Sequence, residues 1–320
     1  MSAYLTANGY TNSPPLLGVV TRHHDKAEPR AIVVLQGFVR NQGDAWAWSL
    51  DTLSQLADEQ AVLDDDAPEE PASSNIYVAF AHVIGTRLAE LHAVLAGPTE
   101  DPAFKPERIT AADTMAWARE VTAQTRQALN AIAAVETWSD PHAAADAAYL
   151  KQHGAALIKQ IPALAAAAQN QSKTRVHGDF HLGQVLIAQG DAILIDFEGE
   201  PARTLDERRA KFAPISDAAG MLRSFDYARA VASAGRAAMT PRIAGRRVAI
   251  LQHMHEQACA AFLDGYQNGT PADRSVLDFF LLRKAAYEVC YEAANRIPWL
   301  PVPLRGLAEL AAHLVAQATP

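Results

Sequence analysis

Cysteine is scarce in this sequence, with two residues of that type among 320. Cys259 and Cys290 do not form a CxxC pair, and both lie in largely apolar stretches with helical spacing, so we expect buried free thiols and no metal site built on them. The histidines give a metal site little support either, because His23 and His24 are adjacent in a predicted turn and the others are scattered.

Positive charge and long apolar runs are also lacking. The 28 Lys and Arg residues against 36 Asp and Glu residues give a net charge of -8, so no overall positive field attracts nucleic acid or an anionic membrane surface. No run of eighteen apolar residues occurs, and the first fifteen residues lack the pattern of a secretory signal. We therefore expect a cytoplasmic protein with no nucleic-acid or membrane partner, acting on small molecules or on other proteins.

The first half of the chain contains one predicted hairpin and a helical stretch. Residues 16–20 and 31–39 are β-branched runs separated by a polar turn, and they are the only strands we expect in this half. Asp44 stands at the N-cap position of a following helix. An acidic segment, residues 62–75, predicts a surface loop, and residues 76–168 have helical spacing with one break near residues 97–108.

A second small hairpin is predicted among the helices of the second half. The runs Val-Leu-Ile-Ala and Ala-Ile-Leu-Ile-Asp flank the turn Gln-Gly-Asp, between residues 185 and 196. Helical spacing then returns from residue 216 to residue 318, interrupted by the proline-punctuated run at residues 296–304. A short hairpin within a helical chain is a place to look for chemistry.

Two acidic motifs frame this hairpin, HGDFHLGQV from residue 177 and ILIDFEGEP from residue 193. Phosphoryl transfer needs a carboxylate that accepts the proton of the attacking hydroxyl, and oxygen ligands that hold Mg²⁺ on the nucleotide phosphates. Asp179 can act as that base, and Gln184 and Asp196 can act as the metal ligands. The spacing is typical of a kinase catalytic loop, because an amide follows the first Asp by five residues and the second Asp opens Asp-Phe-Glu.

Each motif alone is also explained as a polar turn, since Asp and Gly are common turn residues. Their joint occurrence on either side of one hairpin favours phosphotransfer chemistry. We expect His177 to be structural, lying beneath Asp179 and hydrogen-bonding the backbone. His181 lies between the predicted base and the metal ligand, so it is a candidate for contact with the substrate.

These motifs resemble those of maltokinases, which are members of the aminoglycoside-phosphotransferase branch of the kinase-like fold. The resemblance extends through residues 35–46, 217–228 and 284–304, and Gln184 favours the maltokinase subgroup because ordinary members have Asn there. It implies an α+β, protein-kinase-like fold in which residues 1–44 are an incomplete N-terminal β-lobe with the hinge. Residues 45–320 would be a mostly α-helical C-lobe with the small catalytic β-hairpin and the sugar-acceptor site.

The resemblance also implies a nucleotide site and a buttress for the catalytic loop. The backbone of the hinge residues would contact adenine, and Phe38 would line the pocket, although the same residues also read as a plain edge strand. Asp217 would open a helix that supports the catalytic loop, or simply cap that helix. The implied hinge residues are Gln36, Gly37, Phe38 and Val39.

A sugar-acceptor site is suggested by the C-terminal segment. Tyr287 and Tyr291 share one helix face with Glu288 and Glu292 alongside, and aromatic faces next to carboxylates suit the C–H faces and hydroxyls of a sugar. Core packing explains the same tyrosines without any ligand. With the resemblance, we expect a maltose pocket that involves His181, Glu198, Tyr287, Tyr291, Arg296 and Trp299.

The lysine that grips the α- and β-phosphates in kinase-like proteins is not identifiable. The first lysine is Lys26, which lies in the predicted turn of the hairpin, and no glycine-rich loop precedes it. We therefore expect an N-terminally truncated kinase, for which a missing N-lobe segment or trehalose synthase is a possible partner.

The leading hypothesis is transfer of the γ-phosphate of ATP, with Mg²⁺, to the anomeric hydroxyl of maltose, giving maltose 1-phosphate for glycogen and trehalose metabolism. One alternative is a kinase for another sugar or an amino sugar such as glucosamine, because the catalytic loop says little about the acceptor. Another alternative is an inactive fragment or subunit that needs a partner lobe.

Overall fold

The computed structural model describes residues 1–320 except 25–26, 63–73, 235–238, 268–272 and 318–320. Lys26 and most of the predicted acidic loop therefore lie outside the described residues. Packing divides the chain into two compact units, each described by itself. The first unit comprises Met1–Lys105, His177–Ala210 and Ala232–Gly269, and the second comprises Pro106–Val176, Lys211–Val231 and Thr270–Pro320.

The predicted N-terminal hairpin is present in the first unit, after the short helix α1 (Ser2–Ala7). Strands β1 (Leu16–His24) and β2 (Ala27–Gln36) pair antiparallel, with Val20 opposite Val33. The second strand ends at Gln36 and not at Val39 as expected, because its partner strand begins at Leu16, opposite Gln36, and is preceded by Pro15, which has no N–H to donate; the Gly37 N–H makes the last bond, to Pro15 O over 2.8 Å. Most of the large apolar side chains of this two-stranded sheet are exposed, namely Leu17, Val19, Val20, Ile32, Val33, Val34 and Leu35.

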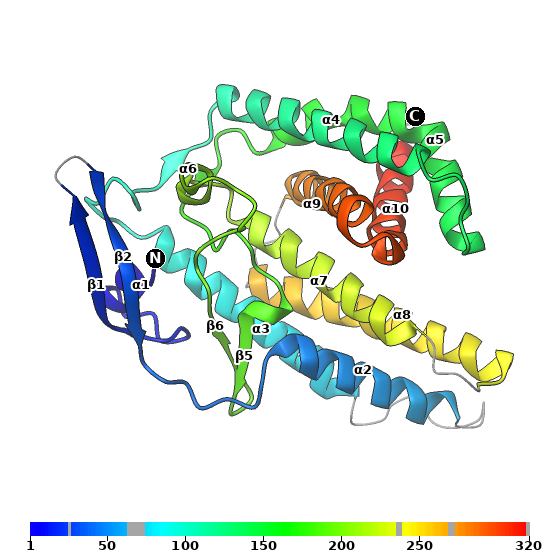
Figure 1. The fold of residues 1–320 in the computed structure, drawn as a ribbon, viewed down its shortest axis with the longest axis horizontal. Coiled ribbons are helices and arrows are strands. Elements are labelled where there is room, and N and C mark those ends of the chain that lie inside the picture. The colour runs from blue at the N-terminus through cyan, green and yellow to red at the C-terminus, as the bar shows by residue number, and fades with distance from the viewer. Residues whose placement is uncertain (25–26, 63–73, 235–238, 268–272, 318–320) are drawn as a thin grey trace. The chain divides into compact units, whose positions relative to one another are not determined.

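Three long helices form the body of the first unit (Figure 1): α2 (Ala45–Ala61), α3 (Ser74–Leu95) and α8 (Pro241–Gln267). Asp44 caps α2 as predicted, accepting at Oδ1 from the Ala47 N–H over 2.8 Å. Glycines let α3 and α8 approach closely, because a Cβ on Gly85 would overlap the carbonyl oxygen of Phe262 and one on Gly265 would overlap that of His82. The two backbones therefore pack directly against each other.

The segment Ile76–Leu95 of helix α3 is long and apolar enough to cross a membrane, by length and composition alone. A helix in the core of a soluble protein passes the same test. Leu88, Leu91 and Leu95 have no exposed surface, which is how a core helix buries its apolar face.

The second predicted hairpin is also present in the first unit. Strands β5 (Val185–Ala188) and β6 (Asp191–Leu194) pair antiparallel and follow a single 3-10 turn, η1 (Leu182–Gln184). The connecting residues Gln189 and Gly190 both have positive φ, 56° and 79°, as a type I′ hairpin turn requires. The short helix α6 (Leu205–Arg209) follows the hairpin.

Long helices also dominate the second unit. They are α4 (Ala111–Ala133), α5 (Pro141–Ala167), α9 (Arg274–Asn295), α10 (Pro301–Gln317) and all but the last two residues of α7 (Ile215–Ser233). Their core includes an aromatic cluster in which Trp117 stacks on Phe212, 4.9 Å between ring centroids, and Phe280 contacts both.

Two details of the predicted secondary structure, and the predicted burial of the cysteines, were wrong. A two-residue strand, β3 (Glu107–Arg108), pairs with β4 (Ser172–Lys173), so the first half contains a strand beyond the hairpin. Residues 76–168, expected to have a single break near residues 97–108, break a second time after Ala133, and Asp140 caps the start of α5. Cys259 and Cys290 are free, as expected, but are half-buried.

The break predicted near residue 296 is confirmed, yet it is shorter than its prolines suggested. A 3-10 turn, η2 (Ile297–Trp299), joins α9 to α10. Pro301 and Pro303 lie within the first turn of α10, where the backbone N–H groups have no partner within the helix and proline is tolerated.

Candidate functional site

The loop before β5 is fastened to the segment after β6 by His177, which is 1% exposed. Its Nε2 lies 2.9 Å from Ile195 O, and the Asp179 N–H donates to Nδ1 over 3.4 Å. These partners fit a neutral ring protonated at Nε2. The ring also contacts Phe180 and Phe197, at centroid distances of 5.2 and 5.1 Å. The structural role predicted for His177 is therefore confirmed.

Unusual backbone geometry marks the turn after β6. Asp196 has φ of 61°, in the left-handed region that costs a residue with a side chain roughly 1–2 kcal/mol, although Asp tolerates it better than most. Gly178 and Gly199 also have positive φ, and a Cβ on Gly178 would lie 3.3 Å from Gly199 Cα. Strained residues of this kind concentrate at functional sites.

Two of the predicted phosphotransfer residues meet directly. The Gln184 amide donates from Nε2 to Asp196 Oδ2 over 3.1 Å. Asp179 lies two residues after His177, the residue that bonds the carbonyl just before Asp196. The Asp179 side chain is 20% exposed, and its Oδ2 lies 3.9 Å from Nε2 of His181. His181 also accepts from the Gly183 N–H at Nδ1 over 3.1 Å, which caps η1.

Gln184 and Asp196 fit a site for Mg²⁺ that is completed by phosphate oxygens. The ion takes oxygen ligands and is usually held by one or two carboxylates with the phosphates of the substrate. Among the described residues, no cluster of three or more His, Cys, Asp or Glu side chains offers an all-protein alternative. The Gln184 nitrogen faces Asp196, and turning the amide over would present its oxygen instead.

The predicted hinge is an exposed stretch that follows β2. Phe38 is 91% exposed, so its ring is open to contact. The Gly37 N–H is used by Pro15 O, and Val39 O accepts from the Asn41 side chain over 2.9 Å. Adenine binding by Gln36–Val39 stays a prediction.

The second unit brings the four predicted acceptor residues of α9 and η2 together. The rings of Tyr287 and Tyr291 stack 6.2 Å apart. The Arg296 guanidinium lies over Tyr291 and Trp299, at 5.4 and 5.2 Å from their centroids. Trp299 in turn stacks on Tyr227 of α7 at 6.2 Å. Lys284 Nζ lies 5.4 Å from the centroid of Tyr287, so the aromatic surface carries cations at both ends.

Buried carboxylates lie beside this surface, and α7 supplies partners that the sequence analysis did not assign to the site. Arg223 Nε donates to Glu288 over 2.9 Å, and Tyr227 OH donates to Glu292 over 3.1 Å. Arg296 holds Glu292 through two bonds of 2.6 and 3.0 Å. Burial raises the pKa of Glu288 although Arg223 opposes this. The charged residues of the otherwise apolar helix α7 were the sequence feature from which these partners could have been predicted.

Glu198 and Asp217 make none of the contacts described above. Glu198 is exposed in the first unit, and its carbonyl oxygen accepts from Arg208 over 3.5 Å. Asp217 is 3% exposed in the first turn of α7, and its predicted support of the catalytic loop stays a prediction. His181 and Glu198 belong to the first unit and the aromatic acceptor residues to the second.

Comparison with solved structures shows the fold of this chain. A glucosamine kinase solved in complex with glucosamine, ADP and inorganic phosphate superposes with a TM-score of 0.79, covering 99% of this chain and 73% of that chain at 24% identity. A second crystal form of glucosamine kinase gives a TM-score of 0.77 at 24% identity, covering 97% and 68%. The chain therefore has the predicted kinase-like fold.

The model of the phosphotransferase enzyme family (APH) matches residues 51–199, a range that includes Asp179, Gln184 and Asp196. Residues 51–199 are thus similar to the phosphotransferase enzyme family. Glucosamine kinase of Streptacidiphilus jiangxiensis is 27% identical over 321 residues, covering 96% of this chain and 64% of that protein. Glucosamine kinase of Mycolicibacterium smegmatis is 26% identical, covering 96% and 69%. The chain spans about two thirds of the length of these relatives, and they do not confirm the expected maltokinase identity.

Proposed function

We propose that this chain performs the ATP-dependent phosphorylation of an amino sugar, with glucosamine as the leading acceptor. The observation that carries the proposal is the catalytic hairpin, in which His177 fastens the Asp179 loop to the Asp196 turn and Gln184 contacts Asp196. The similarity to glucosamine kinases at 27% and 26% identity supports glucosamine over maltose as the acceptor.

In this proposal Asp179 accepts the proton of the sugar hydroxyl as the phosphoryl group is transferred. A half-buried carboxylate near His181 suits that task, because it stays accessible to the substrate while its orientation is restricted. Gln184 and Asp196 would hold Mg²⁺, which neutralises phosphate charge when bound. The backbone of Gln36–Val39 would bind adenine.

The acceptor would lie on the aromatic surface of Tyr287, Tyr291 and Trp299. Aromatic faces stack on sugar C–H groups and also attract the ammonium group of an amino sugar. The carboxylates of Glu288 and Glu292 border the same surface and are held by Arg223 and Arg296, so the choice of an amino sugar rests on the similarity to glucosamine kinases. Maltose remains the second candidate acceptor. Its phosphorylation would give maltose 1-phosphate, a reaction of glycogen and trehalose metabolism.

A sugar panel tests the proposal. Purified chain is assayed for ADP release with glucosamine, maltose and glucose, in the presence of Mg²⁺, beside Asp179→Asn. Glucosamine is expected to give the highest kcat/KM, and loss of the base should lower kcat by about 10²- to 10⁴-fold. Faster turnover of maltose would reject glucosamine, and equal rates for both proteins would reject the role of Asp179.

A second candidate function is that of a subunit that becomes active with a further polypeptide. The observation that favours it is the β1–β2 hairpin, whose apolar side chains are exposed on a sheet of only two strands. Calorimetry with ATP and Mg²⁺ distinguishes the two readings. Binding and turnover by the isolated chain would argue against the need for a partner, whereas absence of both would support it. We propose a cytoplasmic location in either case.

A further inference from the structure

Each outer edge of the catalytic hairpin is covered by a chain segment that flanks the β1–β2 hairpin. On the β5 side, Gln42 N–H donates to Ile187 O over 2.8 Å, and Ile187 N–H donates to Gly43 O over 3.0 Å. On the β6 side, Leu194 N–H donates to Asn12 O over 2.8 Å. The residues just before β1 and just after β2 therefore hold opposite edges of β5–β6.

The β5 edge is held by backbone hydrogen bonds, whereas the β6 edge is also held by hydrogen bonds from the Asn12 side chain. The Asn12 amide donates from Nδ2 to Ala192 O over 3.1 Å and to Asp191 Oδ2 over 3.1 Å. Its Oδ1 accepts from the Thr11 hydroxyl over 3.4 Å. Asn12 is 8% exposed, so these groups have little access to water. A short side chain with two N–H donors and an acceptor is needed here, and asparagine provides it.

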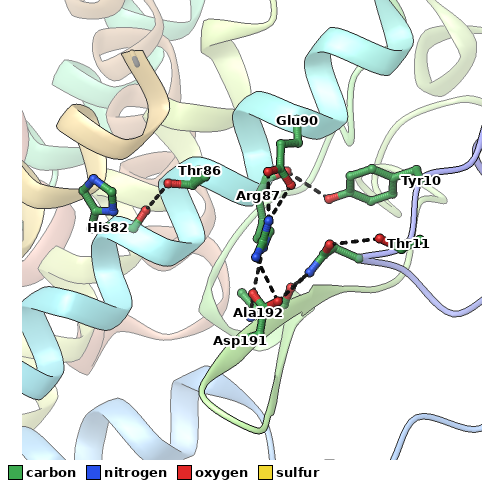
Figure 2. Close-up of polar contacts among 9 residues, drawn as sticks. Tyr10, Thr11, His82, Thr86, Arg87, Glu90, Asp191 and Ala192 are labelled. Atoms are coloured by element: carbon green, nitrogen blue, oxygen red, sulfur yellow. Dashed lines mark hydrogen bonds and ion pairs between the residues drawn. The ribbon is translucent and has the colours of Figure 1, made fainter. Parts of the chain in front are cut away.

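Asp191 links this contact to helix α3 (Figure 2). Arg87 Nε donates to Asp191 Oδ1 over 2.7 Å, and Arg87 Nη2 donates to Oδ2 over 3.0 Å. Arg87 also pairs with Glu90 at 2.8 Å, and its carbonyl oxygen accepts from Tyr10 OH over 2.9 Å. Burial alone would raise the pKa of Asp191, but the bonds from Arg87, Ala192 N–H and Asn12 outweigh it and lower the pKa. The carboxylate is thus ionised and fully engaged at neutral pH.

The location of this network gives it a functional meaning. Strand β6 ends at Leu194, two residues before Asp196, and β2 ends at Gln36, where the predicted hinge begins. We infer that Asn12 is a positioning residue: it fixes β6, and through it the Asp196 turn, to the chain segment that leads into the β1–β2 hairpin. This inference rests on the proposed kinase function, because its consequence is the alignment of Asp196 with a nucleotide.

The decisive variant is Asn12→Asp, which keeps the shape of the side chain. It removes both donors and places a second carboxylate against Asp191, so the contact with β6 is expected to open. The swap Asn12→Asp with Asp191→Asn restores one donor facing one acceptor. Asn8→Asp is the matched control, because it adds the same charge four residues earlier at an exposed position.

Two readouts are compared at a temperature where all four proteins are folded. Amide hydrogen exchange of residues 193–197 is expected to accelerate in Asn12→Asp, to recover partly in the swap, and to match the wild type in Asn8→Asp. In steady-state kinetics, Asn12→Asp should lower kcat about 10- to 100-fold and raise KM for ATP, because misplacement by about 1 Å carries such costs. The KM for the sugar should stay within about twofold, since Asn12 contacts none of the predicted acceptor residues.

The outcomes separate this inference from the proposed function. Unchanged exchange in folded Asn12→Asp, or changed exchange with unchanged kcat and KM for ATP, would overturn the positioning role. A wild-type chain that phosphorylates no sugar would reject the proposed function, and the exchange experiment would then decide whether Asn12 fixes the Asp196 turn.

Discussion

The Gln184 side chain hydrogen-bonds the Asp196 carboxylate over 3.1 Å, and the whole β5–β6 hairpin lies between these two residues in the sequence. Asp196→Asn keeps the size of the side chain and tolerates the φ of 61° that this position requires. If the pair holds Mg²⁺, this variant should need at least about 10-fold more Mg²⁺ for half-maximal activity. A Mg²⁺ titration of ATP turnover measures this.

Asp51→Asn is the control for that titration, because it removes the same charge from an exposed position of α2. Its Mg²⁺ requirement should equal that of the wild type. A requirement unchanged in Asp196→Asn would show that Asp196 is no metal ligand.

The close approach of α3 and α8 gives a prediction about stability. Gly85→Ala would drive a methyl group into the carbonyl oxygen of Phe262, so the helices must separate, at a cost of about 3 kcal/mol in the free energy of unfolding. Gly245→Ala on the same α8 meets no atom within 4 Å and should stabilise by about 0.5–1 kcal/mol. Urea denaturation of both variants measures the two shifts, and a Gly85→Ala midpoint equal to that of the wild type would contradict the packing.

Sequence reasoning predicted the features whose cause lies within a few residues. The cap at Asp44, the presence of a turn between β5 and β6, and the role of His177 follow from local spacing and from the chemistry of each residue. The spacing of Asp179, Gln184 and Asp196 pointed to phosphotransfer, and the kinase-like fold was implied by the resemblance of these motifs to those of maltokinases.

Contacts between distant segments were not predicted. Asn12 contacts Asp191 across 179 positions and Arg223 contacts Glu288 across 65. Helical or strand periodicity relates residues only a few positions apart, so it does not predict such pairs. The end of β2 was misplaced for the same reason, because it depends on where the partner strand begins, at Leu16 opposite Gln36. The acceptor specificity was likewise beyond sequence motifs, since the catalytic loop is shared by kinases of different sugars.

The buried pair of Arg223 and Glu288 gives a second prediction about stability. Arg223 is 3% exposed and Glu288 is 8% exposed, so Arg223→Met would leave a carboxylate in the interior without its main partner. We expect a loss of about 3–5 kcal/mol, and partial recovery when Glu288→Gln is added. Arg305→Met breaks the exposed pair with Glu309 and should cost less than about 1 kcal/mol. Equal denaturant midpoints for Arg223→Met and Arg305→Met would contradict the larger cost predicted for the buried pair.

The last prediction concerns pH and the carboxyl group of Asp278 on α9, which is 1% exposed. Arg274 lies 2.8 Å and His313 3.6 Å from this carboxyl group, yet burial raises its pKa above the ordinary value. The folded protein therefore binds this proton more tightly than the unfolded chain does. The resulting stabilisation is complete below the unfolded pKa, which is about 3.9, and is lost as pH rises through the folded pKa.

Asp278→Asn removes the titration and keeps the shape of the side chain. The variant should be more stable than the wild type at pH 7 to 8, and the difference should shrink as the pH approaches 4, because the folded wild type then regains the proton that it binds more tightly than the unfolded chain does. Thermal unfolding between pH 4 and pH 8 measures this, with Asp51→Asn as the exposed control that shows no such trend. A variant less stable than the wild type at pH 8, with the difference vanishing at pH 4, would mean that Arg274 and His313 outweigh burial and that the pKa of Asp278 is lowered.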